Sequence, residues 1–166
     1  MKAETPLSIA VVTVSDTRTD ETDKSGNVLV DFLQGAGHSL HSKQIVKDDV
    51  YDLRAIVSTL IADSSVNAIL TTGGTGFTPR DNTQQALQPL FDVHIEGFGE
   101  LFRQLSYEEI GSSTVQSRVF GGLANSTIVF CLPGSPGACK TGWEKIIAEQ
   151  LDSSHKPCNF VDKLNI

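Results

Sequence analysis

An apolar strand that runs directly into a glycine-rich loop is the feature that most constrains what this 166-residue chain can fold into. The apolar run Ala68–Leu70 ends in two threonines, and the loop Gly73–Gly76 follows with the sequence GGTG. An acid, Asp81, comes next, just before Asn82 and Thr83, where a helix is expected to begin. This order places bare backbone N–H groups and a carboxylate at the end of a parallel strand. We therefore expect this stretch to gather phosphate groups and a metal ion.

Segments of two apolar periodicities alternate along the chain. Continuous apolar or β-branched runs predict strands, and apolar residues at helical spacing predict helices between them. The expected strands cover residues 7–14, 41–46, 66–72, 92–95, 118–123 and 127–132, and the expected helices cover residues 28–36, 53–61, 83–90, 100–109 and 143–151. Such alternation is typical of βαβ units. The sequence thus predicts an α/β fold: a three-layer α/β/α sandwich with a mostly parallel, doubly wound sheet, a short antiparallel edge and one domain over residues 1–166.

Composition narrows the classes of partner and compartment. The formal net charge of -7, with no basic cluster, argues against nucleic-acid binding. The three cysteines, Cys131, Cys139 and Cys158, form no pattern typical of structural zinc, and so sparse a set is typical of a reducing cytoplasm. No segment approaches the roughly 18 apolar residues that a membrane span needs. We expect a cytoplasmic protein with neither a nucleic-acid nor a membrane partner.

Polar or glycine-rich segments follow the expected parallel strands. Ser15 and Asp16 follow the first strand, and Asp48 and Asp49 follow the second. The segment Pro133–Pro136 separates an apolar strand from the last helix. In doubly wound sheets, ligands bind at the carboxyl ends of the strands. These segments and the glycine loop are therefore expected to meet at one edge of the sheet.

The glycine loop and the acid behind it also have plain structural interpretations. The loop can be a tight strand-to-helix turn, although the hydroxyls of Thr71, Thr72 and Thr75 favour an anion site. It is neither a P-loop nor a dinucleotide fingerprint, because the spacing of its glycines and the absence of a following GK[ST] exclude both. Asp81 or Asn82 can cap the following helix, which leaves the role of Asp81 open.

Other candidates have similar alternatives. Asp49 is the expected cap of the second helix, and Asp16 fits local hydrogen bonding and function equally well. Arg80 and Lys140 are the cations nearest the loops, and each can meet a phosphate or remain solvated. Phe98 is expected in the core or in a subunit interface.

The segments at the strand ends, taken together, resemble the molybdenum cofactor biosynthesis proteins of the MoaB/MogA type, which include the G domain of gephyrin-like proteins. The matching pieces are VVTVSDTR (Val11–Arg18), IVKDD (Ile45–Asp49), TTGGTG with RDNT (Thr71–Thr83), EGFGELFRQLSYEEIG (Glu96–Gly111), STVQSR (Ser113–Arg118) and CLPGSP (Cys131–Pro136). These pieces occur in order, at family-like spacing, over nearly the whole chain.

The resemblance implies a reaction and the residues that perform it. Active members transfer AMP from Mg-ATP to the terminal phosphate of molybdopterin and release pyrophosphate. Two aspartates matching Asp48 and Asp81 are then catalytic and hold the Mg²⁺, so that catalysis is mostly positioning and electrostatics. The residues expected to contact substrate or nucleotide are Ser15, Thr72, Gly73, Gly74, Thr75, Gly76, Ser106, Gly134 and Ser135.

The resemblance also implies a homo-oligomer, a trimer or, in the MoaB branch, often a hexamer. Apolar residues near Phe91, Phe98, Phe102 and Tyr107 are compatible with a subunit interface. The chain looks closer to the MoaB branch, some of whose members have lost the aspartates and are catalytically silent. This chain keeps both aspartates, which favours an adenylyltransferase; the alternative is a silent protein that binds molybdopterin or a precursor.

Overall fold

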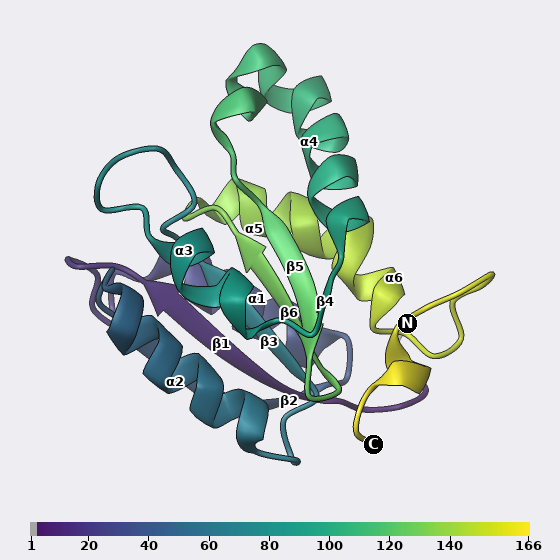
Figure 1. The fold of residues 1–166 in the computed structure, drawn as a ribbon. Helices are drawn as coiled ribbons and strands as arrows, with labels where there is room; N and C mark the ends of the chain where they lie inside the picture. The colour runs from purple at the N-terminus through teal and green to yellow at the C-terminus, as the bar shows by residue number, and fades with distance from the viewer. Residues whose placement is uncertain (1–2) are drawn as a thin grey trace.

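The computed structural model describes residues 3–166, and these residues form a six-stranded sheet with helices on both faces (Figure 1). The strands are β1 (Ser8–Val14), β2 (Ser39–Val46), β3 (Ala68–Thr72), β4 (Val93–His94), β5 (Phe120–Ala124) and β6 (Thr127–Leu132). The helices are α1 (Lys24–Gly35), α2 (Val50–Ala62), α3 (Thr83–Leu87), α4 (Glu96–Ile110), α5 (Pro136–Gly142) and α6 (Ala148–Gln150). Shorter turns are η1 (Gln88–Leu90), η2 (Gly111–Gln116), the π-helical η3 (Trp143–Ile147) and η4 (Val161–Lys163).

The strand order is β2-β1-β3-β6-β5-β4. Strands β2, β1, β3 and β6 pair in parallel, whereas β5 is antiparallel to both β6 and β4. The β5–β6 hairpin turns through Asn125 and Ser126, which have φ values of 50° and 60°, and two left-handed residues suit the twist of a two-residue hairpin. The architecture confirms the predicted three-layer sandwich with a mostly parallel sheet and an antiparallel edge.

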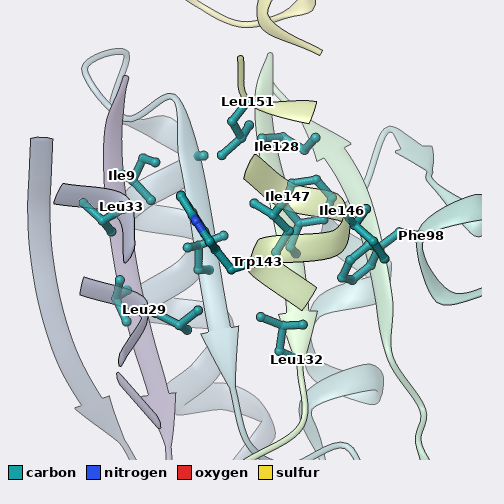
Figure 2. Packing of buried hydrophobic residues seen from close by; sticks show 14 of the residues in the cluster. Ile9, Leu29, Leu33, Phe98, Ile128, Leu132, Trp143, Ile146, Ile147 and Leu151 are labelled. Atoms are coloured by element: carbon teal, nitrogen blue, oxygen red, sulfur yellow. The ribbon is translucent and has the colours of Figure 1, made fainter. Parts of the chain in front are cut away.

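Buried side chains on the strands alternate between two apolar cores, one on each face of the sheet. Ile9 and Val11 of β1 belong to the core beneath α1, while Ala10 and Val12 belong to the core beneath α2. This alternation follows from the two-residue period of a strand. Figure 2 shows the first core, in which residues from α1, α4 and the last helix converge: Leu29, Leu33, Phe98, Trp143, Ile146 and Ile147.

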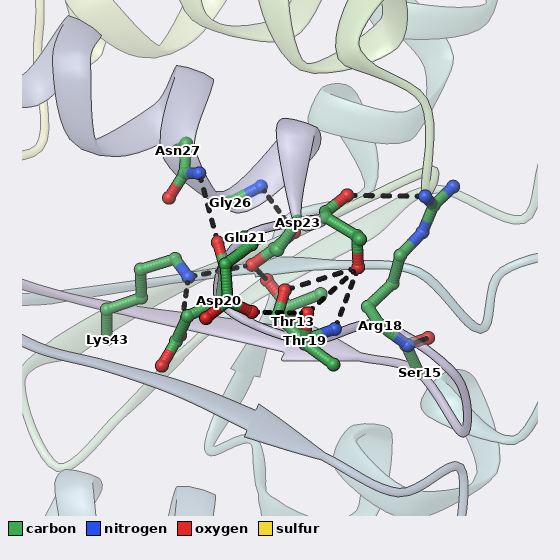
Figure 3. Close-up of polar contacts among 11 residues, drawn as sticks. Thr13, Ser15, Arg18, Thr19, Asp20, Glu21, Asp23, Gly26, Asn27 and Lys43 are labelled. Atoms are coloured by element: carbon green, nitrogen blue, oxygen red, sulfur yellow. Dashed lines mark hydrogen bonds and ion pairs between the residues drawn. The ribbon is translucent and has the colours of Figure 1, made fainter.

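A buried polar cluster fixes the start of α1, several residues before the apolar periodicity predicts a helix. Asp23 is almost wholly buried, and its carboxylate accepts hydrogen bonds from the Gly26 N–H at 2.9 Å and the Thr13 hydroxyl at 2.7 Å. The Lys43 ammonium lies 3.0 Å from the same carboxylate (Figure 3). A buried carboxylate is stable only when it is fully bonded, and the partners of Asp23 come from β1, β2 and the first turn of α1. The cluster therefore joins these three elements.

Helix α4 begins at Glu96, four residues before the expected boundary at Glu100. The first turn of α4 contains two glycines, Gly97 and Gly99, and glycine is a poor helix former. Gly99 has a packing reason, because a Cβ there would lie 2.6 Å from the carbonyl oxygen of Val119. The glycine allows the helix to pass close to the chain entering β5.

The last helix also starts earlier than predicted, at Pro136 instead of Trp143. The Ser135 hydroxyl accepts a hydrogen bond from the Ala138 N–H at 3.2 Å and so caps the helix. Small residues replace the usual apolar stripe here, and a Cβ at Gly142 would lie 2.5 Å from Leu132 Cδ2. The predicted helix over residues 83–90 is α-helical only as far as Leu87 and continues as a 3₁₀ turn.

The aromatic residues expected near a subunit interface differ in their exposure. Phe98 and Phe102 are buried in the core of the subunit, so neither side chain is available to an interface, whereas Tyr107 is exposed. Cys131 is buried, as expected for a residue of a central strand. Within residues 3–166, no helix combines the length and hydrophobicity needed to cross a bilayer.

Candidate functional site

A cleft of about 480 Å³ opens at the carboxyl ends of the parallel strands. It brings together most of the candidate catalytic and binding residues predicted from the sequence: Asp48, Gly73, Gly74, Thr75, Gly76, Asp81, Ser106, Gly134 and Ser135. These residues come from four separate segments of the chain. A second cavity of similar volume lies toward β4, and its two arginines, Arg103 and Arg118, are bonded to backbone carbonyl oxygens. The predicted chemistry therefore gathers in the cleft at the strand ends.

Two positions of the glycine loop combine a left-handed backbone with close contacts, and both features favour glycine. Gly73 has a φ of 106° and Gly74 a φ of 69°, both in the left-handed region. A Cβ at Gly73 would lie 2.3 Å from the Val14 carbonyl oxygen, and one at Gly74 would lie 2.2 Å from the Thr83 hydroxyl oxygen. That hydroxyl donates to the Gly73 carbonyl at 2.8 Å, which ties the loop to the start of α3.

Asp48 is a buried carboxylate at the floor of the cleft, with 8% of its surface exposed. Its Oδ1 accepts a hydrogen bond from the Asn82 N–H at 3.1 Å, and its own N–H donates to Asp16 Oδ1 at 3.2 Å. Burial, followed by the nearby charges of Asp81 and Asp16, raises the pKa of Asp48 above the ordinary aspartate value, although the Asn82 bond opposes this. A carboxylate in that position gains from a neighbouring cation.

Asp81 also lines the cleft and is held in place by Thr78. Its Oδ2 accepts from the Thr78 N–H at 2.9 Å and from the Thr78 hydroxyl at 2.7 Å. Burial acts to raise the pKa of Asp81, but these hydrogen bonds and the Arg118 charge outweigh it and hold the pKa below the ordinary value. The capping alternative is wrong for Asp81: Asn82 occupies the N-cap position, and no side chain caps α3.

Arg118 positions the loop between the glycines and Asp81, a role that the sequence reasoning missed. Its guanidinium donates to the Gly76 carbonyl at 2.8 Å, the Asp81 carbonyl at 2.9 Å and the Gln84 side chain at 3.3 Å. It also lies over the Phe77 ring, 5.1 Å from the centroid. The only signal was its place at the end of the STVQSR segment, far along the chain from the loop it holds.

The other charged candidates divide into structural and surface roles. Asp49 caps α2, as predicted, by accepting from the Tyr51 and Asp52 N–H groups at 2.9 Å each. Lys140 is exposed on α5 and does not line the cleft. Asp16 accepts from the Asp48 N–H and from Arg80, and the Arg80 hydrogen bond is the first cause of a lowered pKa at Asp16.

Ser15 and Thr72 lie outside the lining of the main cleft. Both line a smaller cavity of about 90 Å³ that shares Val14 and Gly134 with it. The Ser15 hydroxyl accepts from the Arg18 N–H at 3.0 Å, and the Thr72 hydroxyl donates to the Pro133 carbonyl at 2.8 Å. Each hydroxyl is thus engaged by the protein itself.

Residues of α4 and of the loop after β6 also line the cleft. Gly134 approaches the glycine loop closely, since a Cβ there would lie 3.4 Å from Gly73 Cα. Its carbonyl accepts from the Ser25 hydroxyl at 2.9 Å, and Ser135 caps α5. Ser106 lies on α4 and lines the cleft. The structure therefore places Ser106 in the same cleft as the segments at the strand ends.

The donor set of the cleft fits a magnesium ion that arrives with a phosphate ligand. No group of three or more His, Cys, Asp or Glu side chains within residues 3–166 is arranged to hold a metal alone. Mg²⁺ in nucleotide sites usually takes one or two carboxylates and completes its shell with phosphate and water. Asp48 and Asp81 supply two such carboxylates, and their Oδ2 atoms lie 3.3 and 2.8 Å from the Cβ positions that Gly74 and Gly76 leave empty.

Thiol chemistry does not fit the site. Burial raises the pKa of Cys131 to about 12 and that of Cys139 to about 11. Neither thiol ionises appreciably at neutral pH, so neither is an activated nucleophile.

Comparison with known proteins gives this geometry a family context. The profile of a family described as "Probable molybdopterin binding domain" matches residues 10–153. Molybdenum cofactor biosynthesis protein B of Escherichia coli (strain K12) is 54% identical over 155 residues, which are 93% of this chain and 91% of that protein. A crystal structure of a molybdenum cofactor biosynthesis protein B superposes with a TM-score of 0.87 at 46% identity, covering 90% of this chain and 94% of the other. The tungsten cofactor synthesizing protein MoaB from Pyrococcus furiosus superposes with a TM-score of 0.79 at 37% identity, covering 89% and 94%.

Proposed function

Because the chain belongs to the molybdopterin-binding family of molybdenum cofactor biosynthesis proteins, we propose that its cleft binds molybdopterin and transfers AMP to it from Mg-ATP. The transfer joins the α-phosphate of ATP to the terminal phosphate of molybdopterin and releases pyrophosphate. The observation that carries the proposal is the meeting of Asp48, Asp81 and the glycine loop in one cleft with Ser106 and the 133–136 loop.

The residues of the cleft would act mainly by binding and orientation. The backbone N–H groups of Gly73–Gly76 offer donors to phosphate oxygens, and the glycines let the ligand approach the backbone closely. Asp48 and Asp81 would hold the Mg²⁺, which offsets the charge of the departing pyrophosphate. Asn82 orients Asp48, and Thr78 orients Asp81, so both carboxylates are fixed before the ligand binds.

Pyrophosphate release from Mg-ATP in the presence of molybdopterin tests the proposal. The parent protein should release pyrophosphate, and both Asp48→Asn and Asp81→Asn should reduce the rate by about a hundredfold or more. Each amide keeps the shape of the side chain and one acceptor oxygen, so the loss reports on charge at the metal. Equal rates in the parent and both variants would refute the assignment of the carboxylates.

A second function, binding of molybdopterin or a precursor without transfer, has one observation in its favour. Within the described chain, the cleft supplies only two carboxylates, Asp48 and Asp81, and no group of three or more side chains is arranged to hold a metal. Retained molybdopterin binding by the parent, with no pyrophosphate release above background, would establish this function and refute the first.

We also propose that the protein assembles as a trimer or hexamer and acts in the cytoplasm. The exposed apolar side chains that support assembly lie on α4 and η2, which project from the body of the molecule (Figure 1). They are Leu101, Tyr107, Ile110 and Val115. Light scattering at micromolar concentration should give at least three times the 17.9 kDa chain mass, and a monomer would refute assembly. All three cysteines are free, which supports a reducing compartment.

A further inference from the structure

An ion pair joins two loops beside the cleft: neither Arg80 nor Asp16 lines it, but Asp16 is bonded to Asp48, which does. Arg80 lies in the loop between β3 and α3, and Asp16 follows β1. The Arg80 Nε lies 2.8 Å from Asp16 Oδ2, and its Nη2 contacts the same oxygen. The Arg80 side chain is 67% exposed and the Asp16 side chain 32%. The pair thus lies near the surface, 64 residues apart in sequence, and can open without disturbing the core.

The charges around this pair are unbalanced. Asp16, Asp48 and Asp81 place three carboxylates at one end of the sheet, where their charges act on one another. Of the other cations in this region, Arg118 commits its guanidinium to three protein acceptors, Arg18 donates to the Thr22 carbonyl at 3.2 Å, and Lys47 acts on Asp16 through its charge alone. Arg80 is held by one carboxylate oxygen alone among the described residues. Its guanidinium is therefore available to a ligand.

We infer that Arg80, which lies beside the cleft, binds the phosphate of a ligand in it, and that Asp16 holds Arg80 until that phosphate displaces the carboxylate. A guanidinium binds phosphate oxygens through two parallel N–H donors, which is a stronger arrangement than its contacts to a single carboxylate oxygen. An exposed ion pair contributes little to stability, so the exchange costs little. This inference rests on the proposed function, because it assigns a residue to the phosphates of the ligand bound there.

Asp16 keeps a second role throughout the exchange. Its Oδ1 accepts from the Asp48 N–H, whereas Oδ2 is the atom that faces Arg80. The variant Asp16→Asn therefore keeps an acceptor for Asp48 and removes the charge that attracts Arg80. This separation of the two oxygens makes Asp16→Asn a clean way to release Arg80.

A double-mutant cycle tests the exchange with two probes, tripolyphosphate without Mg²⁺ and Mg-ATP, by titration calorimetry at low salt. Arg80→Gln should weaken the binding of both probes about tenfold, as expected for loss of a charge-assisted pair of hydrogen bonds. Asp16→Asn should tighten tripolyphosphate binding about threefold in the parent background. The same change in the Arg80→Gln background should give a clearly smaller gain, since no arginine is left to release.

The matched control is Lys140→Gln, which removes one positive charge from an exposed site on α5 outside the cleft. It should change binding less than twofold. Equal losses in Arg80→Gln and Lys140→Gln, or equal Asp16→Asn gains in both backgrounds, would overturn the inference. Thermal unfolding of each variant within about 2 °C of the parent would confirm that the fold is unchanged.

These experiments can refute phosphate binding by Arg80 and adenylyl transfer independently of each other. Tripolyphosphate binding that depends on Arg80, in a protein that releases no pyrophosphate, would support the inference and refute adenylyl transfer. Pyrophosphate release that is unaffected by Arg80→Gln would support transfer and overturn the inference. A parent protein that binds neither probe would overturn both.

Discussion

Substitution of Gly74 by alanine should destabilise the protein strongly, because two separate costs meet at this position. Its φ of 69° lies in the left-handed region, which costs an L-residue roughly 1–2 kcal/mol. The added Cβ would lie 2.2 Å from the Thr83 hydroxyl oxygen, so the threonine must rotate. That rotation breaks the buried 2.8 Å bond to the Gly73 carbonyl, at a cost of about 1–3 kcal/mol. Gly74→Ala should therefore lower the free energy of unfolding by about 2–5 kcal/mol.

Urea unfolding followed by the fluorescence of Trp143 measures this change. Trp143 is the only tryptophan and is buried in the core, so its emission reports on global unfolding. The matched control is Gly97→Ala in α4, where no atom lies within 4 Å of the added Cβ. That control should stabilise the protein by about 0.5–1 kcal/mol, as expected for glycine to alanine in a helix. A Gly74→Ala variant within about 0.5 kcal/mol of the parent would refute the reasoning.

Three further substitutions test the remaining parts of the cleft. Asp48→Asn should raise the melting temperature at pH 7 and change it little near about pH 3, because the raised pKa of Asp48 means that its ionised carboxylate destabilises the fold as pH rises. Thermal scans at the two pH values measure the difference, and equal shifts in melting temperature would contradict the prediction. Gly76→Ala should weaken Mg-ATP binding in calorimetry with a smaller change in the free energy of unfolding, because the added Cβ would lie 2.8 Å from Asp81 Oδ2. Unchanged Mg-ATP affinity would count against Asp81 as a ligand of the magnesium ion. Arg118→Ala should lower the free energy of unfolding by about 2–4 kcal/mol in urea titrations, through the loss of three hydrogen bonds. Full recovery of stability in Arg118→Lys would show that the positive charge stabilises the loop and that the three hydrogen bonds do not.

Local patterns in the sequence were sufficient to predict the central strands and one helix cap. The apolar runs of β1, β3 and β6 predicted buried central strands, because a strand covered on both faces needs apolar residues on both. The Asp49 cap of α2 was also predictable, since a capping aspartate acts within three residues of its own position.

Boundaries were missed where packing overrode local preference. Gly99 lies inside α4 because the Val119 carbonyl leaves no room for a side chain, and α5 begins at Pro136 among small residues that fit against Leu132. Neither fact is a property of the neighbouring residues. The spacing of apolar residues therefore placed both helix starts several residues too late.

The sequence by itself determined that a glycine loop, two aspartates and a Pro-Gly-Ser segment follow the parallel strands. That was enough to place them at one end of the sheet, because parallel strands share the direction of their carboxyl ends. Only the tertiary structure decided which groups touch. It turned Asp48 into a buried carboxylate beside Asn82, joined Asp16 to Arg80 across 64 residues, and brought Arg118 back to hold the loop that carries Asp81. Such contacts depend on strand order and on the packing of loops that are remote in sequence, and neither is encoded in the spacing of nearby residues.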